Sequence, residues 1–204
     1  MKFNKQSGQV SRLLLVLAII ILVAVVIVYL VMRMAEKPPE PTVPTTPIWP
    51  MPVYEQNLGN IRFVFESAIN RGNILRASEI PNNRNKTQKD LSISNPGAKF
   101  IQITIGAQNI GTENTVQNAW TIEDIVDSKG RHYVPLANNV SPWLPNPNLC
   151  GALLKPAFDP TPCTKIYEVS KESTGLKITV EAGQNNKVIS SKNYDSSLLD
   201  LIIK

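Results

Sequence analysis

Residues 99–111 read KFIQITIGAQNIG, and this segment decides the fold of the larger part of the chain. Apolar side chains at positions 101, 103, 105 and 107 alternate with polar or small ones at positions 102, 104, 106 and 108. A period of two is typical of a β-strand that is buried on one face and lies in an antiparallel sheet. The turn residues Asn109 and Gly111 are expected to end this strand.

Shorter segments of the same kind lie on both sides of it. Residues 61–66 alternate in the same way, and residues 120–126 and 131–134 flank the turn sequence Asp-Ser-Lys-Gly at 127–130, which predicts a β-hairpin. The polar stretch 70–94 is expected to form a long loop. Further strands are expected at 165–169, 176–180 and 187–190, whereas the segment 196–203 fits either a strand or a short helix. The pattern therefore predicts a mainly β domain, an antiparallel β-sandwich.

The segments from about residue 95 to residue 182 resemble the telokin-like, immunoglobulin-like extracytoplasmic domains, a family of unknown function. The resemblance rests on a long strand that ends in Asn-x-Gly, here Asn109 and Gly111. A second strand then runs into an Asp-x-x-Gly hairpin and an aromatic residue, here Asp127, Gly130 and Tyr133. The chain departs from the family in a proline-rich insertion at residues 135–162. The resemblance implies an immunoglobulin-like sandwich on an anchored surface protein and supplies no catalytic residues.

Residues 13–32 read LLLVLAIIILVAVVIVYLVM, without a charge, a proline or a glycine. As a helix they would span roughly 30 Å, the thickness of the hydrocarbon core of a bilayer. A helix also satisfies its own backbone hydrogen bonds in lipid. The sequence therefore predicts a transmembrane helix with the bilayer as its partner. The alternatives are a buried core helix and a cleaved signal peptide, whose apolar core would be only about 7–15 residues long.

The charges that flank the helix predict its orientation. Lys2, Lys5 and Arg12 precede it, whereas Arg33 and Lys37 follow it. The positive-inside rule therefore places a tail of residues 1–12 in the cytoplasm and residues 53–204 outside the cell membrane, as a single-pass protein with a retained signal anchor.

The segment 33–52 is expected to be a stalk between the helix and the outer domain. Residues 38–52 contain seven prolines, which exclude helix and sheet and favour an extended polyproline II conformation about 45 Å long.

The start of the chain suggests a second interpretation. Gly8-Gln9-Val10-Ser11 resembles the processing site of archaeal prepilins, in which a glycine precedes Gln-x-Ser and a hydrophobic helix follows. Leu13 stands where that family has a glutamate that helps to register neighbouring subunits. The resemblance implies a pilin-like filament subunit that is processed between Gly8 and Gln9.

The positive net charge is located mostly outside the predicted domain. Residues 1–52 hold five basic and two acidic residues, so only +2 of the total charge of +5 belongs to residues 53–204. A domain that binds nucleic acid through phosphates carries a basic stripe, and none is visible in this sequence. The sequence therefore predicts no nucleic-acid partner.

Cys150 and Cys163, the two cysteines of the chain, fall within or next to the insertion. In an oxidising compartment such a pair predicts a disulfide, worth roughly 3 kcal/mol in the chain-entropy model, and the alternative is two reduced thiols. The pair and the single histidine, His132, provide too few ligands for a metal site. No nucleophile or general base stands at a recognisable spacing from His132, so neither an enzyme nor a cofactor is expected.

Three further residues are candidate surface sites. Asn85 and Asn139 begin glycosylation sequons, although Pro142 follows the second sequon closely. Trp143 either contacts a partner or caps the core of the sandwich. Together these features predict a non-catalytic module that is presented at the cell surface and binds a protein or a surface polymer, with tethering raising its effective concentration. The pilin-like subunit is the alternative.

Overall fold

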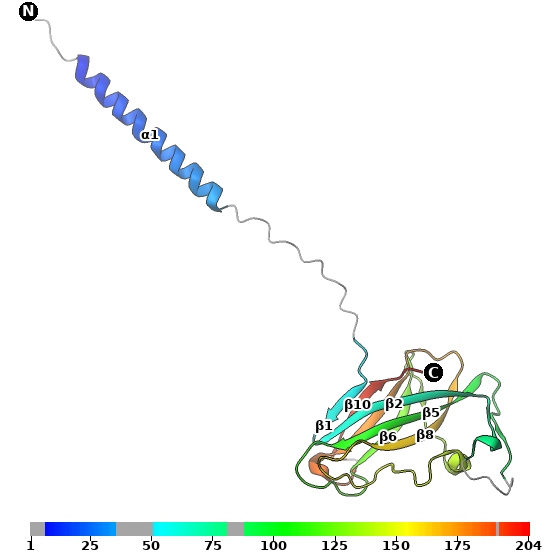
Figure 1. Ribbon diagram of the computed structural model, residues 1–204. Helices are drawn as coiled ribbons and strands as arrows, with labels where there is room; N and C mark the ends of the chain where they lie inside the picture. Colours follow the sequence, from blue (N-terminus) through cyan, green and yellow to red (C-terminus); the bar gives the residue numbers. More distant parts are fainter. Residues whose placement is uncertain (1–6, 36–50, 81–87, 191) are drawn as a thin grey trace, which may run out of the picture. The chain divides into compact units, whose positions relative to one another are not determined.

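The computed structural model describes residues 7–35, 51–80, 88–190 and 192–204 (Figure 1). The chain forms two compact units, Met1–Pro50 and Met51–Lys204. The first unit contains helix α1, Ser7–Ala35, and the described side chains of Leu14–Val31 are all exposed. Among the described residues this is the one helix that is long and apolar enough to cross a membrane. A signal sequence near the N-terminus can meet the same criteria of length and hydropathy.

The second unit is built from two four-stranded antiparallel sheets that enclose one main core. One sheet has the strand order β1-β2-β5-β8, and the other has the order β10-β9-β6-β7. The strands of the first sheet are β1 (Glu55–Leu58), β2 (Ile61–Gly72), β5 (Ala98–Asn109) and β8 (Thr161–Ser170). Those of the second sheet are β6 (Trp120–Val126), β7 (His132–Tyr133), β9 (Lys177–Gly183) and β10 (Tyr194–Asp200). The predicted mainly β fold with an N-terminal apolar helix is therefore confirmed.

The order of the strands is that of strands A, B, E and G, F, C of an immunoglobulin domain, with β1 added beside β2 and β7 added beside β6. Strands β2, β5 and β8 take the places of A, B and E, and β6, β9 and β10 take those of C, F and G. The chain crosses between the sheets after β5, after β7 and after β8. Trp120 on β6 is buried against Phe63 of the facing sheet, with ring centroids 6.3 Å apart, where immunoglobulin domains also bury a tryptophan.

Alternation along β5 places its side chains as the sequence predicts. Ile101, Ile103 and Ile105 are fully buried in the main core between the sheets. The predicted hairpin is also present, because β6 pairs with β7 across the turn at 127–130. The open choice for residues 196–203 is settled in favour of a strand, β10, which pairs with β9 along its whole length.

Two predictions made from the sequence are wrong. Residues 187–190 form no strand, because a short 3-10 helix, η3 (Gln184–Asn186), turns the chain away from the sheet after β9. The stretch 70–94 is not simply a loop. The end of β2, the small hairpin β3 (Ile74–Leu75) with β4 (Leu91–Ser92), and the 3-10 helix η1 (Ala77–Glu79) lie within it.

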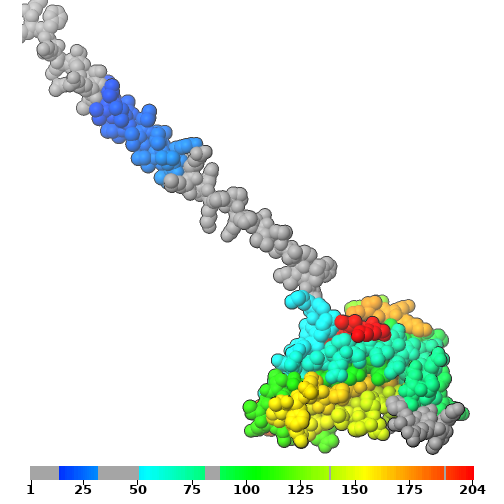
Figure 2. Space-filling view, viewed as in Figure 1, coloured from blue at the N-terminus to red at the C-terminus, as the bar shows by residue number. Residues whose placement is uncertain are grey.

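This segment and the insertion at 135–162 together cover the outer side of the first sheet. Phe100 of β5 and Ile166 of β8 point away from the main core, and Leu75, Val140 and Trp143 bury them in a second apolar cluster. Burial of outward apolar side chains explains why the insertion, with its 3-10 helix η2 (Asn138–Trp143), packs on the sheet rather than extending from it. In Figure 2 the insertion appears in yellow tones as a continuous part of the domain surface.

Two of the four edge strands, β8 and β10, are partly covered by contacts of the chain itself. At β8, Pro135 bridges to Tyr167, and the Leu136 N–H donates to the Ile166 carbonyl over 2.8 Å. At β10, the backbone N–H of Asp200 donates to the Val53 carbonyl over 2.8 Å. Exposed edge strands invite pairing with other chains, and these contacts reduce that exposure at β8 and β10.

Candidate functional site

The predicted disulfide joins Cys150 of the insertion to Cys163 of β8, with 4.5 Å between the two Cα atoms. Neighbouring hydrogen bonds hold the same segment. Asn148 donates to the Thr164 carbonyl over 2.7 Å and accepts from the Thr164 N–H over 3.1 Å, and the Trp120 indole N–H donates to the Ala152 carbonyl over 2.7 Å. The disulfide therefore belongs to a set of contacts that attach the insertion to both sheets.

Trp143 is not a surface contact for a partner. Its side chain lies in the second apolar cluster, the residue is only 8% exposed, and its indole N–H donates to the Arg76 carbonyl over 2.8 Å. Of the two roles that the sequence left open, capping a core is the one that the structure shows. The apolar side chains that the insertion exposes are instead Leu149, Leu153 and Phe158.

The remaining candidate residues stay apart from one another. Asn139 is exposed on η2, and Asn85 lies outside the described residues. The side chain of His132 is 62% exposed, and its Nδ1 lies 3.5 Å from Asp124 Oδ2. Within the described residues, no group of three or more histidine, cysteine, aspartate and glutamate side chains could hold a metal ion.

Asp127 and Tyr133 belong to the motif on which the resemblance to the telokin-like domains rests. With Arg131 and Ser173 they form a hydrogen-bonded cluster at the hairpin turn, which we call the polar lock. The buried carboxylate of Asp127 accepts hydrogen bonds from the backbone and guanidinium of Arg131, the backbone of Lys129 and the hydroxyl of Ser173. Burial raises the pKa of Asp127, but these donors outweigh it and hold the pKa well below its ordinary value. The Tyr133 and Ser173 hydroxyl oxygens are 2.6 Å apart. The motif therefore joins the β6–β7 hairpin to the β8–β9 loop.

Lys165 and Tyr167 of β8 have a similar structural role at an irregularity in β6. The pairing of β6 with β9 shifts register between Ile122 and Ile125, which leaves carbonyl groups directed towards the first sheet. The Lys165 ammonium donates to the Ile122 carbonyl, and the Tyr167 hydroxyl donates to the Glu123 carbonyl over 2.7 Å. Burial lowers the pKa of Lys165 and raises that of Tyr167. Both side chains are thus occupied by backbone acceptors.

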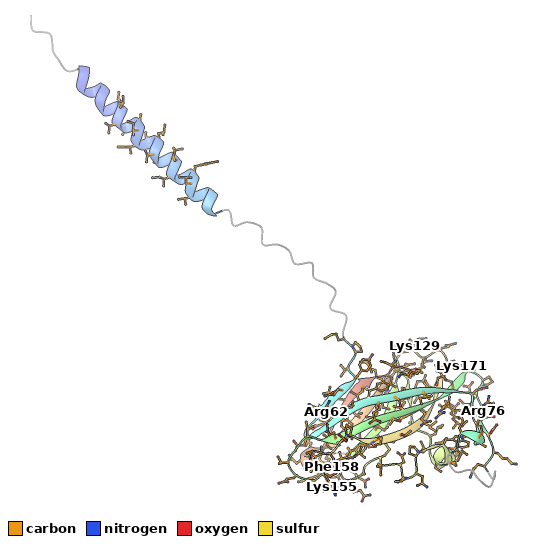
Figure 3. All side chains as sticks on the ribbon, viewed as in Figure 1. Arg62, Arg76, Lys129, Lys155, Phe158 and Lys171 are labelled. Atoms are coloured by element: carbon orange, nitrogen blue, oxygen red, sulfur yellow. A yellow bond between two sulfur atoms is a disulfide. The ribbon has the colours of Figure 1, made fainter. Side chains whose placement is uncertain are left out.

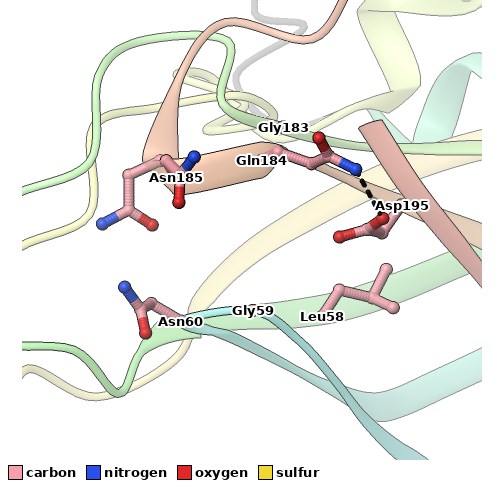
Figure 4. A pocket seen from close by; sticks show the side chains of 8 residues that line it. Leu58, Gly59, Asn60, Gly183, Gln184, Asn185 and Asp195 are labelled. Atoms are coloured by element: carbon pink, nitrogen blue, oxygen red, sulfur yellow. Dashed lines mark hydrogen bonds between the residues drawn. The ribbon is translucent and has the colours of Figure 1, made fainter. Parts of the chain in front are cut away.

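A hollow lined by amide side chains lies where the β1–β2 turn meets the β9–β10 connection (Figure 4). We call it the amide pocket. Its volume is about 290 Å³. The residues that line it are Leu58, Gly59, Asn60, Gly183, Gln184, Asn185, Asn186 and Asp195.

Two carboxamides in the amide pocket are free to bind. In Figure 4 Asn60 and Asn185 face each other across the hollow, and within the described part of the chain neither side-chain amide has a hydrogen-bond partner. On the other side, Gln184 Nε2 donates to Asp195 Oδ1 over 3.1 Å, which fixes the position of both side chains. Asp195 is the one charged residue of the lining.

Backbone conformation places these side chains around the hollow. Gly59 lies in the left-handed region with a φ of 56°, as the tight turn between β1 and β2 requires, and Asn185 and Asn186 have φ values of 55° and 58°. Asparagine tolerates this region better than other residues with a side chain, although such conformations cost energy and are concentrated at functional sites. At Gly183 a Cβ atom would overlap the Lys187 carbonyl, so only glycine lets the chain fold back here.

Hydrogen bonds from the β5–β6 loop hold both walls of the pocket. The Ile110 N–H donates to the Asn60 carbonyl over 2.9 Å, and the Val116 N–H donates to the Asn186 carbonyl over 3.4 Å. The Ile189 N–H donates to the Asn118 carbonyl over 3.1 Å. The β5–β6 and β9–β10 loops correspond to the B–C and F–G loops of immunoglobulin domains, which antibodies use for binding. The pocket therefore lies at the loop end of the sandwich and rests on a fixed scaffold.

A second hollow lies over the outer face of the β10-β9-β6-β7 sheet. It is larger, at about 660 Å³, and more open, and Val53, Val126, Thr179 and Leu198 are among the residues that line it. Unlike the first sheet, this sheet has no second apolar cluster on its outer face among the described residues. Gln56, His132, Thr179, Ser196 and Ser197 add hydrogen-bonding side chains to this lining, but the hollow is wide and open, so the smaller and more enclosed amide pocket is the better defined site.

Two of the basic side chains labelled in Figure 3 have partners within the domain. Arg62 is engaged with Glu55 at 2.6 Å, and Lys155 lies 5.7 Å from the centre of the Phe158 ring. The absence of a nucleic-acid partner stays a prediction.

Comparison with known proteins gives no family. No family model and no curated protein matches the chain. A conserved hypothetical protein from Bacillus anthracis is similar in structure, with 15% identity, a TM-score of 0.46, and coverage of 63% of this chain and 88% of that one. The yjhA protein from Bacillus subtilis has 13% identity, a TM-score of 0.45, and coverage of 72% and 96%. An uncharacterized β-sandwich protein from Clostridium difficile has 8% identity, a TM-score of 0.36, and coverage of 74% and 91%.

The strand order and helix α1 define the class of the chain, an immunoglobulin-like β-sandwich preceded by an apolar helix. The resemblance to the telokin-like domains stays a prediction, because no family model matches the chain.

Proposed function

We propose that this protein is a single-pass membrane protein that presents a non-catalytic binding module outside the cell. The observation that carries the proposal is the combination of α1 with a disulfide-linked sandwich. The side chains of Leu14–Val31 make no contact that buries them, so their apolar surface needs a bilayer or another apolar environment. The Cys150–Cys163 disulfide is typical of domains that mature in an oxidising compartment.

A binding function rather than a catalytic one is supported by the partners of the side chains that could act in catalysis. Lys165 and Tyr167 donate to backbone carbonyls, Asp127 accepts from Arg131, and His132 faces solvent. His132 lines the larger hollow together with Ser196 and Ser197, but among the described residues no hydrogen bond joins it to either hydroxyl, as a nucleophile paired with a general base would require. The amide pocket offers several hydrogen-bonding groups instead, which suits recognition.

Protease accessibility in intact cells tests this proposal. The full chain would be expressed with one epitope tag before Met1 and another after Lys204, and cells would be treated with proteinase K before and after permeabilisation. The proposal predicts that the C-terminal tag is lost from intact cells, whereas the N-terminal tag is lost only after permeabilisation. Protection of the C-terminal tag in intact cells would refute it. A tag on an abundant cytoplasmic protein is the control for cell integrity.

A further inference from the structure

We propose that the amide pocket binds one ring of a neutral saccharide, which names the ligand class of the binding module and rests on the function proposed above. The juxtaposition that carries the inference is the pair of free carboxamides, Asn60 and Asn185, that face each other across the hollow (Figure 4). They come from segments more than a hundred residues apart and meet only because the β1–β2 turn and the β9–β10 connection lie at the same end of the sandwich.

The chemistry of the lining matches hydroxyl groups. A carboxamide offers two N–H donors and a carbonyl acceptor, and a hydroxyl group both donates and accepts. Neighbouring hydroxyls on a sugar ring can therefore pair with Asn60 on one side and Asn185 on the other. Asp195 holds one oxygen towards Gln184 and keeps its second carboxylate oxygen available as a further acceptor for hydroxyl protons.

The same lining disfavours other classes of ligand. Asp195 is the one charge, so an anion would meet a carboxylate and no cation. Divalent cations such as Ca²⁺ take six to eight oxygen ligands and usually several carboxylates, which this lining lacks. An apolar ligand would leave the two amides buried without partners, at a cost in free energy that a hydroxyl-rich ligand avoids.

Size and position agree with a single ring. A hollow of about 290 Å³ lies at the lower end of the roughly 300–1,000 Å³ that is typical of small-molecule sites. Leu58 provides a small apolar surface for the C–H groups of the ring. The chain enters the domain beside Asp200 at the end of β10, whereas Asp195 in the pocket lies near the start of that strand. The pocket is therefore at the end of the sandwich opposite to Val53, where the chain enters the domain.

Saturation-transfer NMR on the full-length protein in lipid nanodiscs tests the inference. The probes are glucose, mannose, galactose and N-acetylglucosamine, with cyclohexanol as a ring of similar size that has a single hydroxyl. We expect at least one sugar to bind with a Kd on the order of 1 mM, as suits a small ligand, and cyclohexanol to give no transfer. If none of the four sugars binds the wild-type protein, the inference is wrong.

Two variants locate the binding. Asn60→Ala removes one free amide, and Asn185→Gly removes the other while keeping a residue that adopts its positive φ. Each should weaken binding of the sugar about fivefold to tenfold, the usual value of a neutral hydrogen bond. The matched control is Asn57→Ala, an exposed asparagine of β1 outside the pocket, which should leave the Kd unchanged. Circular dichroism of all three variants confirms that the fold is retained.

The outcomes separate this inference from the proposed function. Unchanged sugar binding in both Asn60→Ala and Asn185→Gly would overturn the amide pocket as the site. A failure of sugar binding, in the wild-type protein or in the variants, does not change the accessibility of the terminal tags. The membrane topology can therefore be right while the ligand class is wrong. A protected C-terminal tag would remove the proposed function even if sugars bound in vitro.

Discussion

Replacing Trp143 by alanine tests whether the insertion is part of the folded domain or a surface for a partner. The side chain is 8% exposed and packs in the second apolar cluster with Phe100, Val140 and Ile166. Truncating a buried tryptophan to alanine typically costs about 3–5 kcal/mol. Trp143 also donates to the Arg76 carbonyl, which is near the surface and can bond to water after the truncation. We therefore expect the lower part of the range, about 3 kcal/mol.

The measurement is urea unfolding of the Met51–Lys204 unit, followed by far-ultraviolet circular dichroism so that the loss of a tryptophan does not alter the signal. Phe158→Ala is the matched control, because Phe158 is also an aromatic residue of the insertion and is 62% exposed. Its truncation should lower the free energy of unfolding by less than about 1 kcal/mol. If the two variants lose the same small amount of stability, Trp143 does not cap a core and the reasoning fails.

Two further predictions concern the contacts that hold the loops. Replacing both Cys150 and Cys163 by serine should lower the free energy of unfolding by roughly 3 kcal/mol, measured by the same urea titration, and a loss below about 1 kcal/mol would contradict the importance of the disulfide. Because its donors hold the pKa of Asp127 below the ordinary value, the Asp127 carboxylate stabilises the fold above about pH 4, and this stabilisation is lost as the pH falls towards the lower pKa of the folded state. Asp127→Asn should therefore flatten the decline in thermal midpoint between about pH 4 and pH 2, and a decline as steep as that of the wild type would count against the polar lock.

Alternation along the chain was sufficient to predict most of the sandwich. Ile101, Ile103 and Ile105 are buried as their spacing indicates, because a strand between a core and an outer face has to alternate. The same pattern failed for residues 187–190, where Val188 and Ile189 suggested a strand. The conformation there is set by η3, in which Asn185 and Asn186 have positive φ values and direct the chain away from the sheet.

The second apolar cluster was not predictable from local pattern. Phe100 stands at the outward position of β5, where a polar residue is usual, and this was the available signal that another segment covers it. The segments that cover Phe100 are identified only by contacts that Leu75 and Trp143 make with the outer face of the first sheet. Such contacts are set by the topology of the whole domain rather than by neighbours in the sequence.

The amide pocket had almost no signal in the sequence. Asn60 and the run Gln184-Asn185-Asn186 are indistinguishable from ordinary turn residues, because asparagine and glycine are common wherever a chain reverses. Their proximity depends on the pairing of β1 with β2 and on the return of β10 to β9. The motif residues Asn109, Asp127 and Tyr133, in contrast, were visible in the sequence, and in the structure they hold loops in place.

The central claim, that the protein keeps an apolar helix as its anchor, is tested most directly by the intact mass of the mature protein from native membranes. We predict a chain that begins at Met1, contains α1 and has two hydrogens fewer than the reduced sequence because of the Cys150–Cys163 disulfide. A chain that begins at Gln9 would make the protein a processed pilin-like subunit instead. A chain that begins after Ala35 would show a cleaved and released domain and would contradict the account.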